Sequence, residues 1–172
     1  LGTAFGEVTI NALVFTRHAE RFNRVLASAN PAVKMNLICV QSLGPETAIW
    51  LKQKLDAGEW VVMVGDRTSV TREKRVIEAQ FLDAPAPFPQ GPFALAAVLG
   101  VPVSLLFGLR IAGQFTVYFE PFSAPIQLSR QTRQAMLAEW VQRYASRLEH
   151  YCLQAPLEWF NFYDFWQLSD DE

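Results

Sequence analysis

The sequence predicts an α/β protein with a layered, mostly parallel central sheet flanked by helices, a long C-terminal helix and an aromatic tail. Two observations lead to this prediction. Short apolar runs rich in β-branched residues alternate with segments of helical spacing in the first half, and residues 131–152 repeat apolar side chains at helical spacing. At 172 residues, the chain is expected to form a single domain, 1–172, with its own core.

The first half alternates strand and helix twice. Proline suits the first turn of a helix and glycine suits its left-handed end, so Pro45 and Gly58 mark the limits of one helix. The expected elements, in order, are a strand at 8–15, a helix at 18–29, a strand at 35–40, the helix between Pro45 and Gly58, and a strand at 60–64.

The second half contains a hairpin and the longest helix. Gly100 ends a short helix of good helix formers, and Gly113 joins two runs of strand-forming residues. The expected elements are a strand or long loop at 76–82, a helix at 93–99, hairpin strands at 102–109 and 115–122, and a helix at 131–152.

Between these elements, residues 81–93 hold four prolines and a glycine in an apolar stretch with a single charge. Proline fixes φ and removes backbone donors, so the stretch is expected to be stiff and extended, while Gly91 permits a turn that other residues resist. Two interpretations stay open. The stretch forms a rigid apolar wall for a ligand, or it is a structural corner between a strand and a helix.

Composition excludes several classes of function. The net charge is −2 and the basic residues are scattered, which argues against nucleic acid as a partner. No apolar run approaches the ~20 residues of a membrane-spanning helix. Cys39 and Cys152 are expected to be buried thiols, because the Cys and His spacing suits no metal site. The chain also lacks a nucleophile elbow and a phosphate-binding P-loop.

Two sets of polar residues are candidate binding groups. Asp66 and Arg67 follow the strand at 60–64, and ligands of α/β sheets gather beyond the carboxyl ends of strands. Arg17 lies near the start of the expected helix at 18–29, where a phosphate could bind. The alternatives are a strand-end salt bridge for Asp66 and Arg67, and an ordinary solvated face around Arg17.

The end of the chain holds six aromatic residues among the eight at 159–166. Together they carry about 1,000 Å² of surface, more than a monomer usually exposes in one patch. We expect this tail to fold back over the core. The alternative is docking on lipid headgroups, where Trp and Tyr side chains are favoured.

In their order and spacing, several motifs resemble the lysophospholipid acyltransferase superfamily, and most closely the bacterial lipid A late acyltransferases and related acyltransferases. The similarity extends over nearly the whole chain, and each motif is weak by itself. The motifs are Gly65-Asp66-Arg67, the block at 81–93, Val101-Pro102-Val103, and the segments 16–23, 148–151 and 155–166.

The resemblance implies a bacterial enzyme of lipid metabolism that moves a fatty or polyene acyl group to a hydroxyl of a lipid or glycolipid acceptor. The donor would be an acyl carrier protein or coenzyme A thioester, with no further cofactor, and the enzyme would be cytoplasmic and peripheral on the inner face of the cytoplasmic membrane. By the same resemblance, Arg17 meets a phosphate and Asp66 and Arg67 form a second polar site. The residues that shape the acceptor pocket would be Phe88, Pro89 and Gly91.

One departure from the family concerns the catalytic base. The family's His-x4-Asp/Glu motif, whose histidine deprotonates the acceptor hydroxyl, has no match in the sequence. We therefore expect it upstream of Leu1, which makes the chain the C-terminal portion of an acyltransferase domain, inactive alone and without catalytic residues of its own. The alternatives are a non-catalytic module that docks an acyl carrier or a membrane, and a domain whose proline-rich turn is purely structural.

Overall fold

The computed structural model describes residues 8–14, 35–39, 44–67, 76–161 and 164–166. Its contacts divide the chain into two compact units, residues 1–64 and 65–172. The mixed α/β class is confirmed, since helices occur in both units together with one parallel and two antiparallel sheets. That the two units make one domain stays a prediction.

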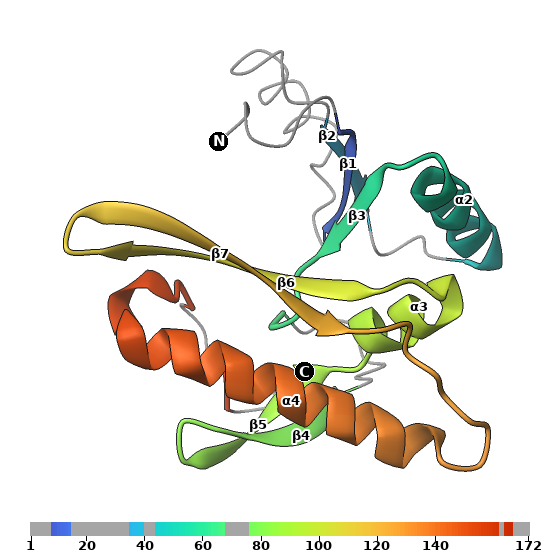
Figure 1. Ribbon diagram of the computed structural model, residues 1–172. Helices are drawn as coiled ribbons and strands as arrows, with labels where there is room; N and C mark the ends of the chain where they lie inside the picture. Colours follow the sequence, from blue (N-terminus) through green and yellow to red (C-terminus); the bar gives the residue numbers. More distant parts are fainter. Residues whose placement is uncertain (1–7, 15–34, 40–43, 68–75, 162–163, 167–172) are drawn as a thin grey trace. The chain divides into compact units, whose positions relative to one another are not determined.

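The first unit contains a three-stranded parallel sheet in the order β2-β1-β3, as Figure 1 shows. Its strands are β1 (Ile10–Val14), β2 (Met35–Cys39) and β3 (Trp60–Met63). Helix α2 (Pro45–Asp56) connects β2 to β3 across β1 and buries Leu51 completely. Gly58 follows α2 at a φ of 81°, as predicted from the left-handed end that glycine favours. The helix expected at 18–29 lies outside the described residues.

A polar side chain sits at the centre of this sheet. Asn11 on β1 is fully buried, and its amide donates to the Glu59 carboxylate at 2.8 Å and to the Trp60 carbonyl at 3.2 Å. Asn36 on β2 donates in turn to Asn11 Oδ1. A buried amide is costly unless it is hydrogen-bonded, so these contacts favour one register of β1 against both neighbours.

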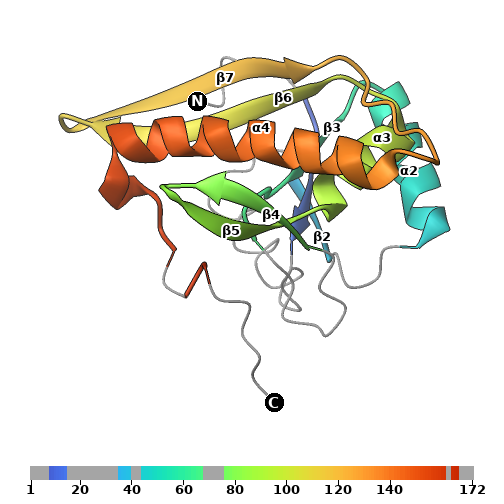
Figure 2. The same cartoon turned by 90° about the horizontal axis from the view of Figure 1, so that it is seen from below.

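The second unit places its long helix between two antiparallel hairpins, and the views in Figures 1 and 2 agree on this arrangement. The sequence predicted the long helix and the hairpin joined at Gly113, and both are confirmed. The elements are β4 (Val76–Phe81), β5 (Ala84–Pro89), α3 (Gly91–Leu99), β6 (Val103–Ile111), β7 (Gln114–Ser123), α4 (Arg133–Gln154) and a short 3-10 turn at Pro156–Glu158.

Within the proline-rich stretch at 81–93, residues Ala84–Pro89 form strand β5, which pairs antiparallel with β4. Pro85, Pro87 and Pro89 alternate along it, and the N–H groups of a strand point alternately to its two sides. The three missing donors therefore fall on one side, which suits an edge strand. The expectation that Gly91 makes a turn other residues resist is wrong, because it lies in the first turn of α3 without a positive φ.

Helix α4 covers the other edge of β4 with polar side chains. The Gln142 amide accepts from the backbone N–H of Gln80 at 2.8 Å and donates to its carbonyl at 3.1 Å. Two helical turns later, the Glu149 carboxylate accepts from the N–H of Leu82 at 2.7 Å. These bonds satisfy backbone groups that an edge strand would otherwise expose.

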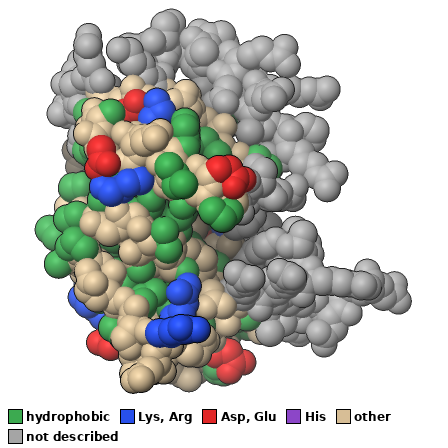
Figure 3. Space-filling model, turned by 90° about the vertical axis from the view of Figure 1, so that its right-hand side faces the viewer, with side chains coloured by type: hydrophobic (Ala, Val, Ile, Leu, Met, Phe, Trp, Pro, Cys, Tyr) green, Lys and Arg blue, Asp and Glu red, His purple; other side chains and the backbone are tan. Residues whose placement is uncertain are grey.

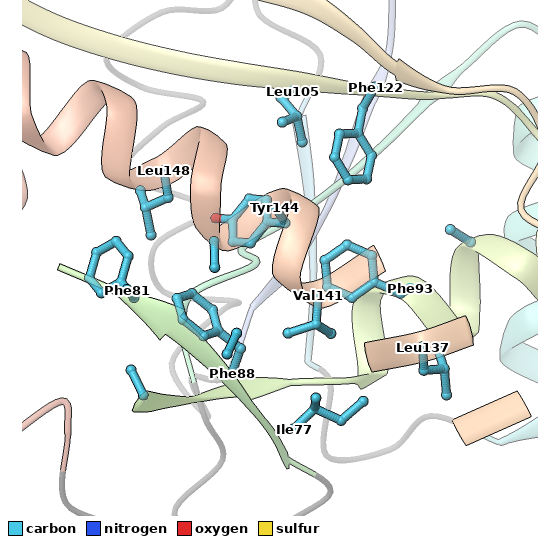
Figure 4. Packing of buried hydrophobic residues seen from close by; sticks show 14 of the residues in the cluster. Ile77, Phe81, Phe88, Phe93, Leu105, Phe122, Leu137, Val141, Tyr144 and Leu148 are labelled. Atoms are coloured by element: carbon cyan, nitrogen blue, oxygen red, sulfur yellow. The ribbon is translucent and has the colours of Figure 1, made fainter. Parts of the chain in front are cut away.

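The core of the second unit lies where the inner faces of the hairpins, α3 and α4 meet. Figure 4 shows Phe81 and Phe88 from the β4–β5 hairpin facing Tyr144 and Leu148 of α4. Cys152 is buried in the same core, as the sequence predicted, and burial raises the pKa of its thiol to about 11. Cys39 in the first unit is only half-buried.

Two further observations concern membrane-spanning helices and basic surface patches. None of the described helices combines the length and the apolar character needed to span a bilayer. On the face of the described residues drawn in Figure 3, acidic and basic side chains are interspersed with apolar ones, without a broad basic patch.

Candidate functional site

Asp66 is one of two buried polar or charged residues among the described part of the chain, with 9% of its surface exposed. The indole Nε1–H of Trp159 donates to Asp66 Oδ2 at 2.9 Å. The two residues are 93 positions apart, so this bond ties the segment after β3 to the aromatic tail. A bond from a neutral donor to a carboxylate holds that carboxylate in one orientation.

Arg67 contacts the same tail through different groups. Its Nη2 donates to the carbonyl of Phe160 at 2.7 Å, and its Nη1 approaches Asn161 Oδ1 at 3.5 Å. Asp66 and Arg67 therefore direct their side chains to neighbouring tail residues. The predicted alternative of a simple salt bridge between them does not describe these contacts.

Tyr144 of α4 packs against the start of this segment. A Cβ placed on Gly65 would lie 2.6 Å from Tyr144 Cζ and 2.9 Å from its hydroxyl, so only glycine allows this close approach. Burial, and after it the negative charge of Asp66, raises the pKa of Tyr144 far above its ordinary value. The phenol therefore stays protonated and keeps a donor hydrogen at neutral pH.

An aromatic cluster joins this segment to the proline-rich strand. The Phe81 ring lies 5.1 Å from that of Trp159 and 5.5 Å from that of Phe88, and the Phe88 ring lies 5.3 Å from that of Phe165. The prediction that the tail folds back over the core is thus confirmed for Trp159 and Phe165. Phe160 stays 58% exposed.

The residues predicted to shape the acceptor pocket differ in their burial. Phe88 is fully buried and belongs to the core, where it offers no surface to an open cavity. Pro89 is also buried, opposite Val76 in the β4–β5 register, and Gly91 is exposed at the start of α3. Arg17 lies outside the described residues. Their role in an acceptor pocket stays a prediction.

No protein-family model matches the chain, and no curated protein shows a significant match to it. Within the described ranges, no group of three or more His, Cys, Asp or Glu side chains is placed to hold a metal ion.

Sequence reasoning missed the residues that hold Asp66 and Arg67 in place. The density of aromatic residues at 159–166 indicated that the tail needed cover, but no local pattern pairs the Trp159 indole with Asp66. Tyr144 was predicted only as part of the apolar stripe of α4. A glycine directly before Asp66 was the single sequence signal of a close backbone approach.

Replacing Trp159 with phenylalanine is expected to lower the free energy of unfolding by about 1–2 kcal/mol, because it removes the bond to a buried carboxylate but keeps an aromatic ring. Urea unfolding followed by circular dichroism measures the change. Trp166→Phe is the matched control, since Trp166 stacks on the same Phe81 ring and is 39% exposed. Equal losses for both variants would contradict a specific role of the indole N–H.

Proposed function

We propose that the chain is part of an O-acyltransferase domain that transfers a fatty or polyene acyl group from an acyl carrier protein or coenzyme A thioester to a hydroxyl of a lipid or glycolipid. In this proposal the two units form one layered α/β domain with a mostly parallel central sheet. The domain works at the inner face of the cytoplasmic membrane, where its acceptor lies.

One observation supports the proposal most. Three segments that carry the resemblance to lysophospholipid acyltransferases come together in the second unit: Asp66 and Arg67 bond to the aromatic tail, and the tail packs on the ring of Phe81 beside that of Phe88. These three segments lie far apart in the sequence, so their contacts exist only in the folded unit. In this proposal, their contacts keep the Asp66 carboxylate and the Arg67 guanidinium in a fixed position to orient a substrate.

The proposed reaction transfers an acyl group from a thioester to a hydroxyl. A general base takes the proton of the acceptor hydroxyl, the oxygen attacks the thioester carbonyl, an ester bond forms and the carrier thiol leaves. The described residues supply binding and orientation in this scheme. By the resemblance, the base belongs to a His-x4-Asp/Glu motif outside the present sequence.

The test uses the intact protein encoded by the full reading frame, with palmitoyl thioesters of acyl carrier protein and coenzyme A and a lipid extract as acceptor. The amount of thiol released and the amount of palmitoyl ester formed should rise together. Asp66→Asn should lower kcat/KM at least about tenfold, because a misplaced substrate loses the benefit of orientation. Asp83→Asn is the matched control, since Asp83 is exposed in a turn at a φ of 64°, which asparagine tolerates.

Thiol release no faster than in buffer, with every donor and acceptor tried, would contradict the proposal. A second candidate function, a non-catalytic docking module for an acyl carrier or a membrane, is favoured by the exposed apolar side chains after α4: Leu157 is 89% and Phe160 is 58% exposed. Retention of an acyl carrier or of vesicles by the intact protein with the thioester left unchanged would support this candidate instead.

A further inference from the structure

A groove of about 380 Å³ lies in the second unit, between residues 120–122 of β7 and the face of α4 that carries Arg143, Ser146 and Arg147. The residues that line the groove include neither Asp66 nor any residue of the aromatic tail. The volume lies within the range of about 300–1,000 Å³ that is typical of small-molecule sites.

Arg143 is held in place at this groove without a carboxylate. Its guanidinium carbon lies 4.5 Å from the centre of the Trp140 ring and 5.2 Å from that of Phe122, and Nη2 donates to the Phe122 carbonyl at 3.2 Å. Among the described residues, no acidic side chain lies within ion-pair distance of it. A guanidinium has five N–H donors, so most of its capacity to bind an anion is unused.

The second arginine of the groove is paired. Arg147 binds the Glu120 carboxylate in a bidentate manner, with Nε to Oε1 and Nη2 to Oε2 both at 2.8 Å, and Tyr151 donates to Oε2 at 3.2 Å. The hydrogen bond from Arg147 holds the pKa of Glu120 below its usual value, so this carboxylate is ionised at neutral pH. With Glu120 neutralising Arg147, Arg143 gives the groove its net positive charge.

We propose that this groove binds a phosphate ester, with Arg143 as the principal contact. A planar guanidinium fixed by two rings matches the paired oxygens of a phosphate. A phosphate monoester also carries a third acceptor oxygen for the remaining N–H groups of Arg147, which lines the same groove, whereas a carboxylate has only two oxygens. The ligand is a soluble phosphate monoester or the monoester headgroup of phosphatidic acid. This site is separate from Asp66 and does not rest on the proposed acyl transfer.

The test is a calorimetric or NMR titration of the full chain with glycerol 3-phosphate, and with acetate at the same ionic strength. Arg143→Gln should weaken binding of glycerol 3-phosphate at least about tenfold, the loss expected for a hydrogen bond between charged groups. Arg133→Gln, on the exposed first turn of the same helix, is the matched control and should leave binding unchanged.

A second variant changes binding in the opposite direction. Glu120→Gln removes the negative charge from the groove and can still accept from Tyr151, so it should tighten binding of glycerol 3-phosphate about fivefold. This gain cannot result from partial unfolding, which keeps the proposal testable if Arg143→Gln folds poorly.

The outcomes are distinct. Equal affinity of the wild type and Arg143→Gln for glycerol 3-phosphate, or no gain in Glu120→Gln, would overturn the site. Acetate that binds as tightly as the phosphate with the same dependence on Arg143 would overturn the ligand class. Sedimentation with phosphatidic acid vesicles then decides the source: retention that is lost in Arg143→Gln assigns the lipid headgroup, and no retention, or retention unaffected by Arg143→Gln, assigns the soluble monoester.

Discussion

Replacing Phe81 with alanine is expected to lower the free energy of unfolding by about 3–5 kcal/mol, the usual cost of deleting a fully buried aromatic ring. Four rings lie against Phe81, and all of them lose contacts in the variant. Their centroids are 5.1 Å (Trp159), 5.5 Å (Phe88), 5.7 Å (Phe165) and 6.0 Å (Trp166) from that of Phe81. Urea unfolding of the full chain measures the loss as a lower midpoint at constant slope.

Phe115→Ala is the matched control for this variant. Phe115 lies on β7, its ring is 53% exposed, and its described neighbour is the backbone position of Gly108. Its replacement should cost about 1 kcal/mol or less, as for most surface substitutions. Losses of similar size for Phe81→Ala and Phe115→Ala would mean that the tail does not contribute to the core in solution.

The predictions that succeeded depend on short-range patterns. Gly113 follows Ala112 in a turn where both residues have a positive φ, at 80° and 50°, and this tight turn fixes the register of β6 and β7. The apolar stripe of α4 could also be predicted, because Leu137, Val141 and Leu148 recur at helical spacing. All three are buried in the structure.

The β4–β5 hairpin could not be predicted in the same way. Its turn uses Leu82 and Asp83 at φ values of 50° and 64°. Aspartate tolerates such a φ but leucine rarely adopts it, so the pair did not mark the turn in the sequence. The prolines that follow suggested a turn or a wall. Their alternation was the overlooked signal, because prolines two positions apart can form an edge strand whose remaining N–H groups still pair.

The sequence identified half of the candidate site. A position directly after a parallel strand was enough to select Asp66 and Arg67. Their partners in the tail are 93 and 94 positions away, and hydrogen bonds over such distances leave no local pattern. The same reason explains why the groove at Arg143 was not foreseen: α4 and β7 meet there only in the folded unit.

The residue before Asp66 provides the second prediction of large effect. Gly65→Ala is expected to lower the free energy of unfolding by about 3 kcal/mol, the upper part of the range for overpacking a core. The new Cβ would lie 2.6 Å from the buried Tyr144 ring, which cannot move aside without displacing its neighbours in the core. The same shift should also move Asp66, which follows Gly65 directly.

Two further variants make this prediction specific to the contact between Gly65 and Tyr144. Gly91→Ala adds the same methyl group where nothing lies within 4 Å and φ is not positive, so it should leave stability unchanged or raise it by up to about 1 kcal/mol. In a Tyr144→Leu background the ring is gone, and Gly65→Ala should then cost less than about 1 kcal/mol. A double-mutant cycle measures this coupling. A cost of Gly65→Ala that is the same in both backgrounds would show that glycine is needed there for its backbone, independently of Tyr144.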